Sequence, residues 1–173
     1  YKAADFINFC DAYDIPVLSL TNVKGYAADV RSEKSIAKAV AKLTYAFANA
    51  NVPKVNVITG EAYGSAYVTM NSKALGADVT YAWPDASIGM MDANEAAKIM
   101  YADDIAKSAD VQSVISEKAA EYAALQSGVE SAAARGYVDT IINPEDTRKY
   151  VAAAFEMLYT KREDRPDKKH GTV

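Results

Sequence analysis

Apolar residues along this chain alternate between helical spacing and short buried runs. Residues 3–13 place Ala3, Phe6, Ile7, Cys10 and Tyr13 on one face, which is the spacing of an amphipathic helix. The same spacing predicts further helices at 35–49, 67–75, 94–101, 110–127 and from 144 or 145 onward. Short apolar or alternating runs predict strands at 16–20, 55–59, 79–83, 87–91 and 136–142. Helices that alternate with short buried strands indicate an α/β domain.

The composition is that of one globular domain. The chain has 173 residues, of which 50% are hydrophobic and 24% are charged, so it can bury a substantial core. A net charge of -4 argues against a nucleic-acid partner, since a polyanion binder is expected to be basic. The single cysteine excludes an internal disulfide framework and favours a reducing, cytoplasmic location. No apolar run is long enough to span a membrane, and the charged segment 161–173 is expected to be an extended tail.

Side chains that commonly carry catalysis are scarce. The one histidine, His170, lies in the charged tail, and Cys10 lies on the apolar face of the first predicted helix. The chain therefore offers neither a Ser–His–Asp triad nor a Cys–His pair. It also lacks metal-ligand spacing, a Walker loop and a GxGxxG motif, so no metal site is predicted. The carboxylates are scattered and lie at expected helix ends.

Residues 59–67 (TGEAYGSAY) connect a predicted buried strand to a helix through small residues. A helix N-terminus presents backbone N–H groups that have no partner within the helix. Small residues let a ligand approach these groups, so the segment can stabilise an oxyanion without a titratable side chain. Close packing of a helix on a strand selects the same residues. The segment by itself supports both interpretations equally.

At this segment the chain resembles the C-terminal half of the biotin-dependent acyl-CoA carboxyltransferases. That family includes the β subunits of propionyl-CoA carboxylase and the α subunits of methylmalonyl-CoA decarboxylase. The similar motifs occur in order along nearly the whole chain: 9–16 (FCDAYDIP), 42–47 (KLTYAF), 62–67 (AYGSAY), 75–78 (LGAD), 81–84 (YAWP), 135–139 (RGYVD) and 165–171 (RPDKKHG).

The resemblance implies a crotonase-like fold (ClpP/crotonase superfamily) built from repeated ββα units. Residues 1–173 would correspond to the second of two domains, without the family's N-terminal carboxyltransferase domain, and the isolated piece is expected to be inactive. Relatives form hexamers whose active sites lie between the N-domain of one subunit and the C-domain of another. The implied partners are a biotin carrier protein or domain, together with biotin carboxylase or membrane decarboxylase subunits.

The implied reaction moves a carboxyl group between carboxybiotin and a short-chain acyl-CoA such as propionyl- or methylmalonyl-CoA. By similarity, the backbone N–H groups of Ser65 and Ala66 would form the oxyanion hole that stabilises the biotin enolate. Gly25, Tyr26 and Gly64 would bind the cofactor. Tyr67 and Val68 would contact the acyl substrate, with CoA as its carrier. A protein that supplies only oxyanion holes fits a cofactor that supplies the acid–base chemistry.

Several positions differ from the family pattern. Ser65 stands where relatives carry Gly, and Asn22 and Lys24 replace Asp and Pro of a VDVPGF turn. Gly60 and Glu61 replace a basic pair, and residues 90–92 (MMD) replace a VMG element. These differences leave a second interpretation, a divergent non-catalytic subunit for assembly or for docking of the biotin carrier. A third is a crotonase-type enoyl-CoA hydratase or isomerase, for which no carboxylate can be placed from the sequence.

Overall fold

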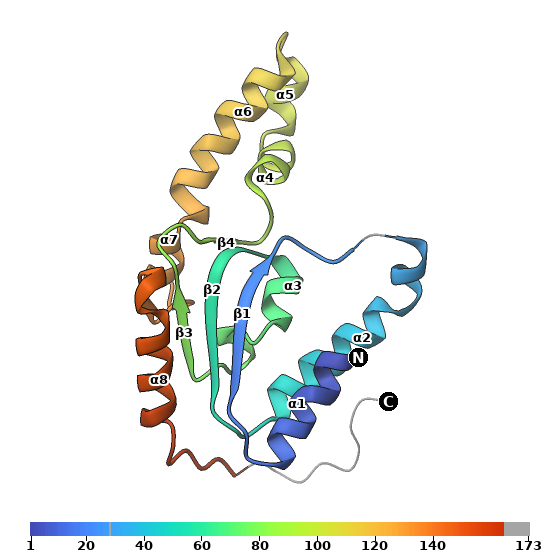
Figure 1. The fold of residues 1–173 in the computed structure, drawn as a ribbon. Coiled ribbons are helices and arrows are strands. Elements are labelled where there is room, and N and C mark those ends of the chain that lie inside the picture. Colours follow the sequence, from blue (N-terminus) through green and yellow to red (C-terminus); the bar gives the residue numbers. More distant parts are fainter. Residues whose placement is uncertain (28, 165–173) are drawn as a thin grey trace.

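The centre of the molecule is a parallel β-sheet. The computed structural model describes residues 1–27 and 29–164. Within them, a five-stranded sheet has the order β1-β2-β3-β5, and β4 pairs in parallel with the last part of β2 (Figure 1). The strands are β1 (Val17–Val23), β2 (Lys54–Tyr63), β3 (Val79–Ala82), β4 (Ser87–Gly89) and β5 (Thr140–Ile141). Because the strands run in parallel, their carboxyl ends meet at one edge, where ligands of α/β proteins commonly bind.

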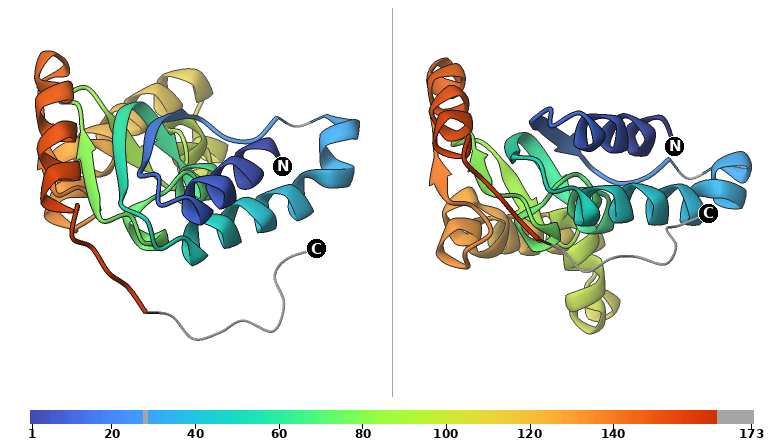
Figure 2. Two further views of the ribbon diagram at one scale, coloured as in Figure 1. Left: turned by 60° about the horizontal axis from the view of Figure 1, so that its bottom comes forward. Right: turned by 90° about the horizontal axis from the view of Figure 1, so that it is seen from below.

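Helices cover both faces of this sheet. The longer helices are α1 (Lys2–Ala12), α2 (Val30–Asn49), α4 (Ala93–Met100), α6 (Val111–Tyr122) and α8 (Thr147–Met157). The short ones are α3 (Gly64–Thr69), α5 (Ala102–Lys107) and α7 (Val129–Ala134). Figure 2 shows α7 and α8 on opposite sides of the strands, and Figure 1 shows α4, α5 and α6 projecting beyond the sheet. In the described part of the chain, no helix has the length and apolar character needed to cross a membrane.

Strand β2 is buried on both faces over residues 54–58, including the polar side chains of Lys54 and Asn56. Val55 and Val57 pack toward α8 in one core cluster, while Ile58 and Ala62 pack with Tyr67 in another. A third cluster joins α1, α2 and the start of β1. The best-buried strand therefore carries the segment that runs directly into the predicted site.

Most of the predicted elements are confirmed, and the boundaries account for most of the differences. Strand β2 continues to Tyr63 rather than ending at 59, because its last residues pair with β4. The helix predicted at 67–75 is wrong as one element. It begins at Gly64 and ends at Thr69, and a separate 3₁₀ turn follows at Lys73–Leu75. Asn71 lies between them with a positive φ of 57°, which breaks the helix.

Other differences are smaller. Helix α2 begins before residue 35 because Asp29 caps it by accepting bonds from the N–H groups of Arg31 and Ser32. The helices α5 and α7 were not predicted, and the strand predicted at 136–142 is only Thr140–Ile141. On α1, Ile7 and Cys10 are buried as predicted, with Ala4 as the third buried residue. Ala3 and Phe6 are exposed instead, Phe6 by 60%. The predicted tail beyond 164, with His170, lies outside the described residues.

Candidate active site

The chain turns sharply where β2 meets α3, and a glycine makes this turn possible. Gly64 follows Tyr63, the last residue of β2, and has a φ of +58°. A Cβ atom at this position would lie 2.9 Å from the backbone oxygen of Met90. L side chains disfavour this backbone conformation, and the oxygen of Met90 leaves them no space. Gly64 therefore sets the direction in which the following N–H groups point.

The predicted oxyanion residues form the first turn of α3. Ser65 is exposed, and Ala66 directly after it is buried. N–H groups in the first turn of a helix have no partner within that helix, so they can bind an external acceptor. Their partial positive charge is suited to an oxygen that gains negative charge. The structure thus places both predicted residues at the carboxyl edge of the sheet, beside the end of β1 (Figure 1).

The two predicted substrate residues point in different directions. Val68 is 41% exposed, on the same short helix as Ser65. Tyr67 is 7% exposed and packs in the core with Ile58 and Ala62. Burial raises the pKa of Tyr67 to about 12, and among residues 1–27 and 29–164 its hydroxyl has no hydrogen-bond partner. The Tyr67 ring is thus a packing element in this structure, and its contact with a substrate stays a prediction.

The end of β1 and the loop that follows it lie against this corner, and we call residues 22–27 the strap. The hydroxyl of Tyr26 donates to the backbone oxygen of Ser65 at 3.1 Å and also contacts the hydroxyl of Thr69 at hydrogen-bond distance. Gly25 is exposed, and a Cβ there would meet no atom within 4 Å. Of the predicted cofactor-binding pair in the strap, only Tyr26 touches the oxyanion segment directly.

The strap has two further attachments to β2. The side-chain oxygen of Asn22 accepts a bond from the N–H of Glu61 at 3.0 Å. A Cβ on Gly60 would lie 2.8 Å from that same oxygen, so the side chain of Asn22 occupies the space that Gly60 leaves. Lys24 pairs with Glu61 at 3.1 Å, and this carboxylate raises the pKa of Lys24. The positions that differ from the family pattern on β1 and β2 therefore contact one another.

A second set of hydrogen bonds supports the corner from the other side. The hydroxyl of Tyr63 donates to the Ser87 hydroxyl at 2.8 Å, and Ser87 donates to the backbone oxygen of Ser127 at 3.3 Å. Ser127 ends the π-helical turn Ala123–Ser127 that follows α6. Sequence reasoning missed Asn22, Thr69 and Ser87 as supporting residues. Only the coincidence of unusual residues at 22 and 60 could have indicated one of these contacts.

The corner can stabilise negative charge through backbone groups. In the part of the chain that the structure describes, no three His, Cys, Asp or Glu side chains gather closely enough to hold a metal ion. The charged side chains of Lys24 in the strap and Glu61 on β2 pair with each other at 3.1 Å. Unpartnered N–H groups at the start of a helix are donors of the kind that an oxyanion hole uses, and this role for Ser65 and Ala66 stays a prediction.

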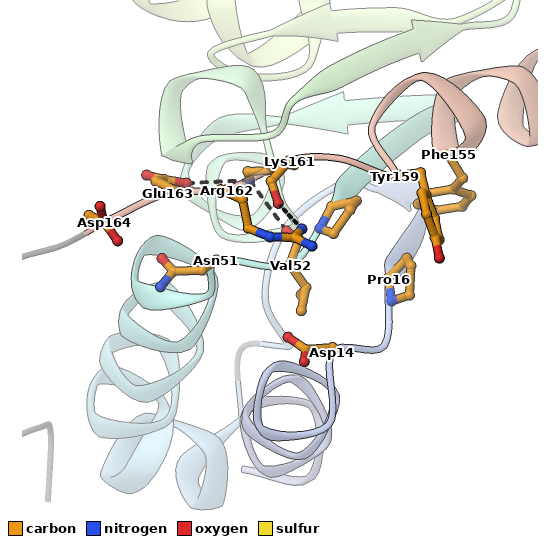
Figure 3. A pocket seen from close by; sticks show the side chains of 11 residues that line it. Asp14, Pro16, Asn51, Val52, Phe155, Tyr159, Lys161, Arg162, Glu163 and Asp164 are labelled. Carbon is orange, nitrogen blue, oxygen red and sulfur yellow. Dashed lines mark hydrogen bonds and ion pairs between the residues drawn. The ribbon is translucent and has the colours of Figure 1, made fainter.

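A cavity of about 550 Å³ lies at the opposite, amino-terminal edge of the sheet (Figure 3). It is bounded by Pro16 and Val52 on the strand side, and by Phe155 and Tyr159 near the end of α8. Lys161 lies at its rim and pairs with Asp78 at 2.9 Å. This pair, which is largely buried, fastens the end of α8 to the turn before β3.

The fold defines a class, the α/β domains of crotonase type, with helices packed on a parallel sheet. The family model for the carboxyl transferase domain matches residues 1–173. The chain belongs to that family.

Known relatives agree with this assignment. The chain is 47% identical to the propionyl-CoA carboxylase beta chain of Saccharopolyspora erythraea over 177 residues, which cover 99% of this chain and 32% of the relative. It is 44% identical to the methylmalonyl-CoA carboxyltransferase 12S subunit of Propionibacterium freudenreichii subsp. shermanii, covering 98% of this chain and 33% of that one. The crystal structure of transcarboxylase 12S with methylmalonyl-CoA bound superposes with a TM-score of 0.94 at 44% identity, over 98% of this chain and 33% of that chain. The chain thus spans about a third of the length of these relatives.

Proposed function

We propose that this chain is the C-terminal domain of a carboxyltransferase subunit that moves a carboxyl group between carboxybiotin and a short-chain acyl-CoA. The match along residues 1–173 to a family of carboxyl transferases carries the proposal. The corner between β2 and α3 supports it, since first-turn N–H groups without a partner in the helix suit the ureido oxygen of biotin. Bound biotin would supply the carboxyl group and the base.

The residues of this chain have three tasks in the proposal. Gly64 turns the chain so that the N–H groups of Ser65 and Ala66 point out of the sheet edge. Those two groups bind the ureido oxygen and stabilise its negative charge as the carboxyl group leaves or arrives. Val68, exposed on the same helix, lines the space for the acyl group.

The proposal extends to partners and location. The acyl-CoA would be held mainly by the N-terminal carboxyltransferase domain, and a biotin carrier protein or domain would deliver the cofactor. Oligomeric assembly follows the relative whose crystal structure is described as a hexamer. Which carboxylase or decarboxylase subunits accompany the chain stays a prediction, as does the cytoplasmic location.

Removal of the backbone N–H group of residue 65 tests the proposal. Ser65→Pro removes the N–H of residue 65, and Ser65→Ala is the control that keeps it. Proline suits the first turn of a helix, and the preceding Gly64 is the residue most tolerant of the backbone that proline imposes. Carboxyl transfer from methylmalonyl-CoA to free biotin is measured in the full-length subunit. We expect a loss of about 10²- to 10³-fold in kcat for the proline variant. Equal rates in both variants, or no transfer by the unmodified subunit with any short-chain acyl-CoA, would refute it.

A further inference from the structure

The peptide unit that joins Ser65 to Ala66 carries a hydrogen-bond network on its oxygen. The Thr69 hydroxyl donates to the backbone oxygen of Ser65 at 2.5 Å, and the Tyr26 hydroxyl approaches the same oxygen at 3.1 Å. The two hydroxyl groups also contact each other. Each hydroxyl has one hydrogen. Thr69 donates its hydrogen to the carbonyl, and Tyr26 shares its single hydrogen between the Thr69 oxygen and the same carbonyl.

The two hydroxyl groups reach this oxygen by different routes. The bond from Thr69 is the local contact that Ser and Thr often make with the carbonyl four residues earlier in a helix. Tyr26 comes from the strap, 39 positions away in the sequence. Its side chain is 39% exposed and belongs to none of the three core clusters. Tyr26 therefore contributes a polar contact to this oxygen and little to the core.

The opposite end of this peptide unit is the N–H of Ala66. Carbonyl and N–H are conjugated across a planar amide, so a donor on the oxygen makes the N–H more polar and fixes the plane. Successive hydrogen bonds in such a chain strengthen one another by about 10–30% each. A hydrogen bond from Tyr26 thus acts on an oxyanion donor that Tyr26 does not touch.

We propose that Tyr26 is a positioning residue that orients and polarises the Ser65–Ala66 peptide, so that the Ala66 N–H becomes a stronger oxyanion donor. The inference rests on the proposed function, because it assigns Tyr26 a role at that same oxyanion corner. The strap is held independently by Asn22 and Lys24, which both contact Glu61. Removal of one hydroxyl should therefore leave the strap in place.

The test compares Tyr26→Phe with Tyr159→Phe in the full-length subunit. Tyr159 is 82% exposed near the opposite edge of the sheet and serves as the matched control. For Tyr26→Phe we expect kcat for transfer to free biotin to fall about two- to eightfold. Loss of a complete oxyanion donor lowers kcat by about 10²- to 10³-fold, and the expected fall is about 10–30% of that effect on a logarithmic scale. The KM values and the melting temperature should be unchanged. Thr69→Ser keeps the hydroxyl and should retain the rate.

Two results would overturn the inference. One is a kcat for Tyr26→Phe equal to that of Tyr159→Phe. The other is a lower melting temperature of Tyr26→Phe that accounts for its lower kcat. A readout that needs no turnover separates this inference from the proposed function. In ¹⁵N-alanine-labelled subunit, the Ala66 amide proton should move upfield in Tyr26→Phe but not in Tyr159→Phe. If the unmodified subunit transfers no carboxyl group, the proposed function fails and this shift still decides whether the hydroxyl polarises the peptide.

Discussion

Replacement of Gly64 by alanine should destabilise the corner between β2 and α3 strongly. Gly64 has a φ of +58°, and holding an L-residue there costs about 1–2 kcal/mol. The new methyl group would lie 2.9 Å from the backbone oxygen of Met90, which a side-chain rotation cannot relieve. Overpacking of this kind adds about 1–3 kcal/mol. The free energy of unfolding should therefore fall by about 2–5 kcal/mol, and the melting temperature by about 4–20 °C.

Gly25→Ala is the matched control, because a Cβ at Gly25 meets no atom within 4 Å and its φ is outside the left-handed region. That variant should be neutral or more stable by about 0.4–1 kcal/mol, through a less flexible unfolded chain. Urea unfolding followed by circular dichroism compares the two variants. If Gly64→Ala unfolds within about 1 kcal/mol of Gly25→Ala, a margin below the strain expected of such a position, the explanation of this turn is wrong.

Three other measurements test the neighbourhood of the corner. Tyr67→Phe removes a buried hydroxyl that has no hydrogen-bond partner in the described part of the chain. Thermal unfolding should therefore show unchanged stability or a gain of up to about 2 kcal/mol. A clear loss of stability would show that this hydroxyl is bonded. Gly60→Ala should cost less when Asn22 is alanine than when it is asparagine, with a coupling of about 0.5–1.5 kcal/mol in a double-mutant cycle, and additive effects would contradict the contact. Hydrogen bonds from the Ser32 backbone and hydroxyl lower the pKa of Asp29 below its usual 3.8. The stability that this cap contributes is therefore present above pH 3.8 and is lost as the pH falls through the pKa of the folded state. An NMR titration midpoint of Asp29 at or above 3.8 would refute this explanation.

The buried strands were predictable because their apolar runs are intrinsic to the sequence. Residues 55–59 (VNVIT) alternate between apolar and polar side chains in a pattern that predicts a strand without any tertiary contact. The structure buries this strand on both faces. The end of β2 was not predictable, because Gly60 and Glu61 have low strand propensity and extend the strand only by pairing with β4. The inner face of α1 was predicted only in part, since Ile7 and Cys10 are buried, whereas Ala3, Phe6 and Tyr13 are exposed and Ala4 is buried instead.

The candidate site also has a part that the sequence predicts and a part that only the structure shows. Small residues between a strand and a helix indicated the segment 59–67, because that signal is local, and the resemblance to the carboxyltransferase family indicated Ser65 and Ala66 within it. The hydroxyl of Tyr26 reaches Ser65 only after the strap folds back along β2, so no local pattern contains that contact. The bond between Tyr63 and Ser87 likewise depends on β4 lying beside β2. Sequence reasoning therefore indicated the segment after β2, and the donor role of Ser65 and Ala66 stays a prediction, whereas the contacts that support this segment required the structure.

A structure of the full-length subunit with biotin bound tests the central claim most directly. The account predicts the ureido oxygen about 2.7–3.1 Å from the backbone nitrogens of Ser65 and Ala66, with the Tyr26 hydroxyl still on the carbonyl of Ser65. Biotin ordered elsewhere, for example in the cavity beside Lys161, with no contact to these two N–H groups, would contradict it.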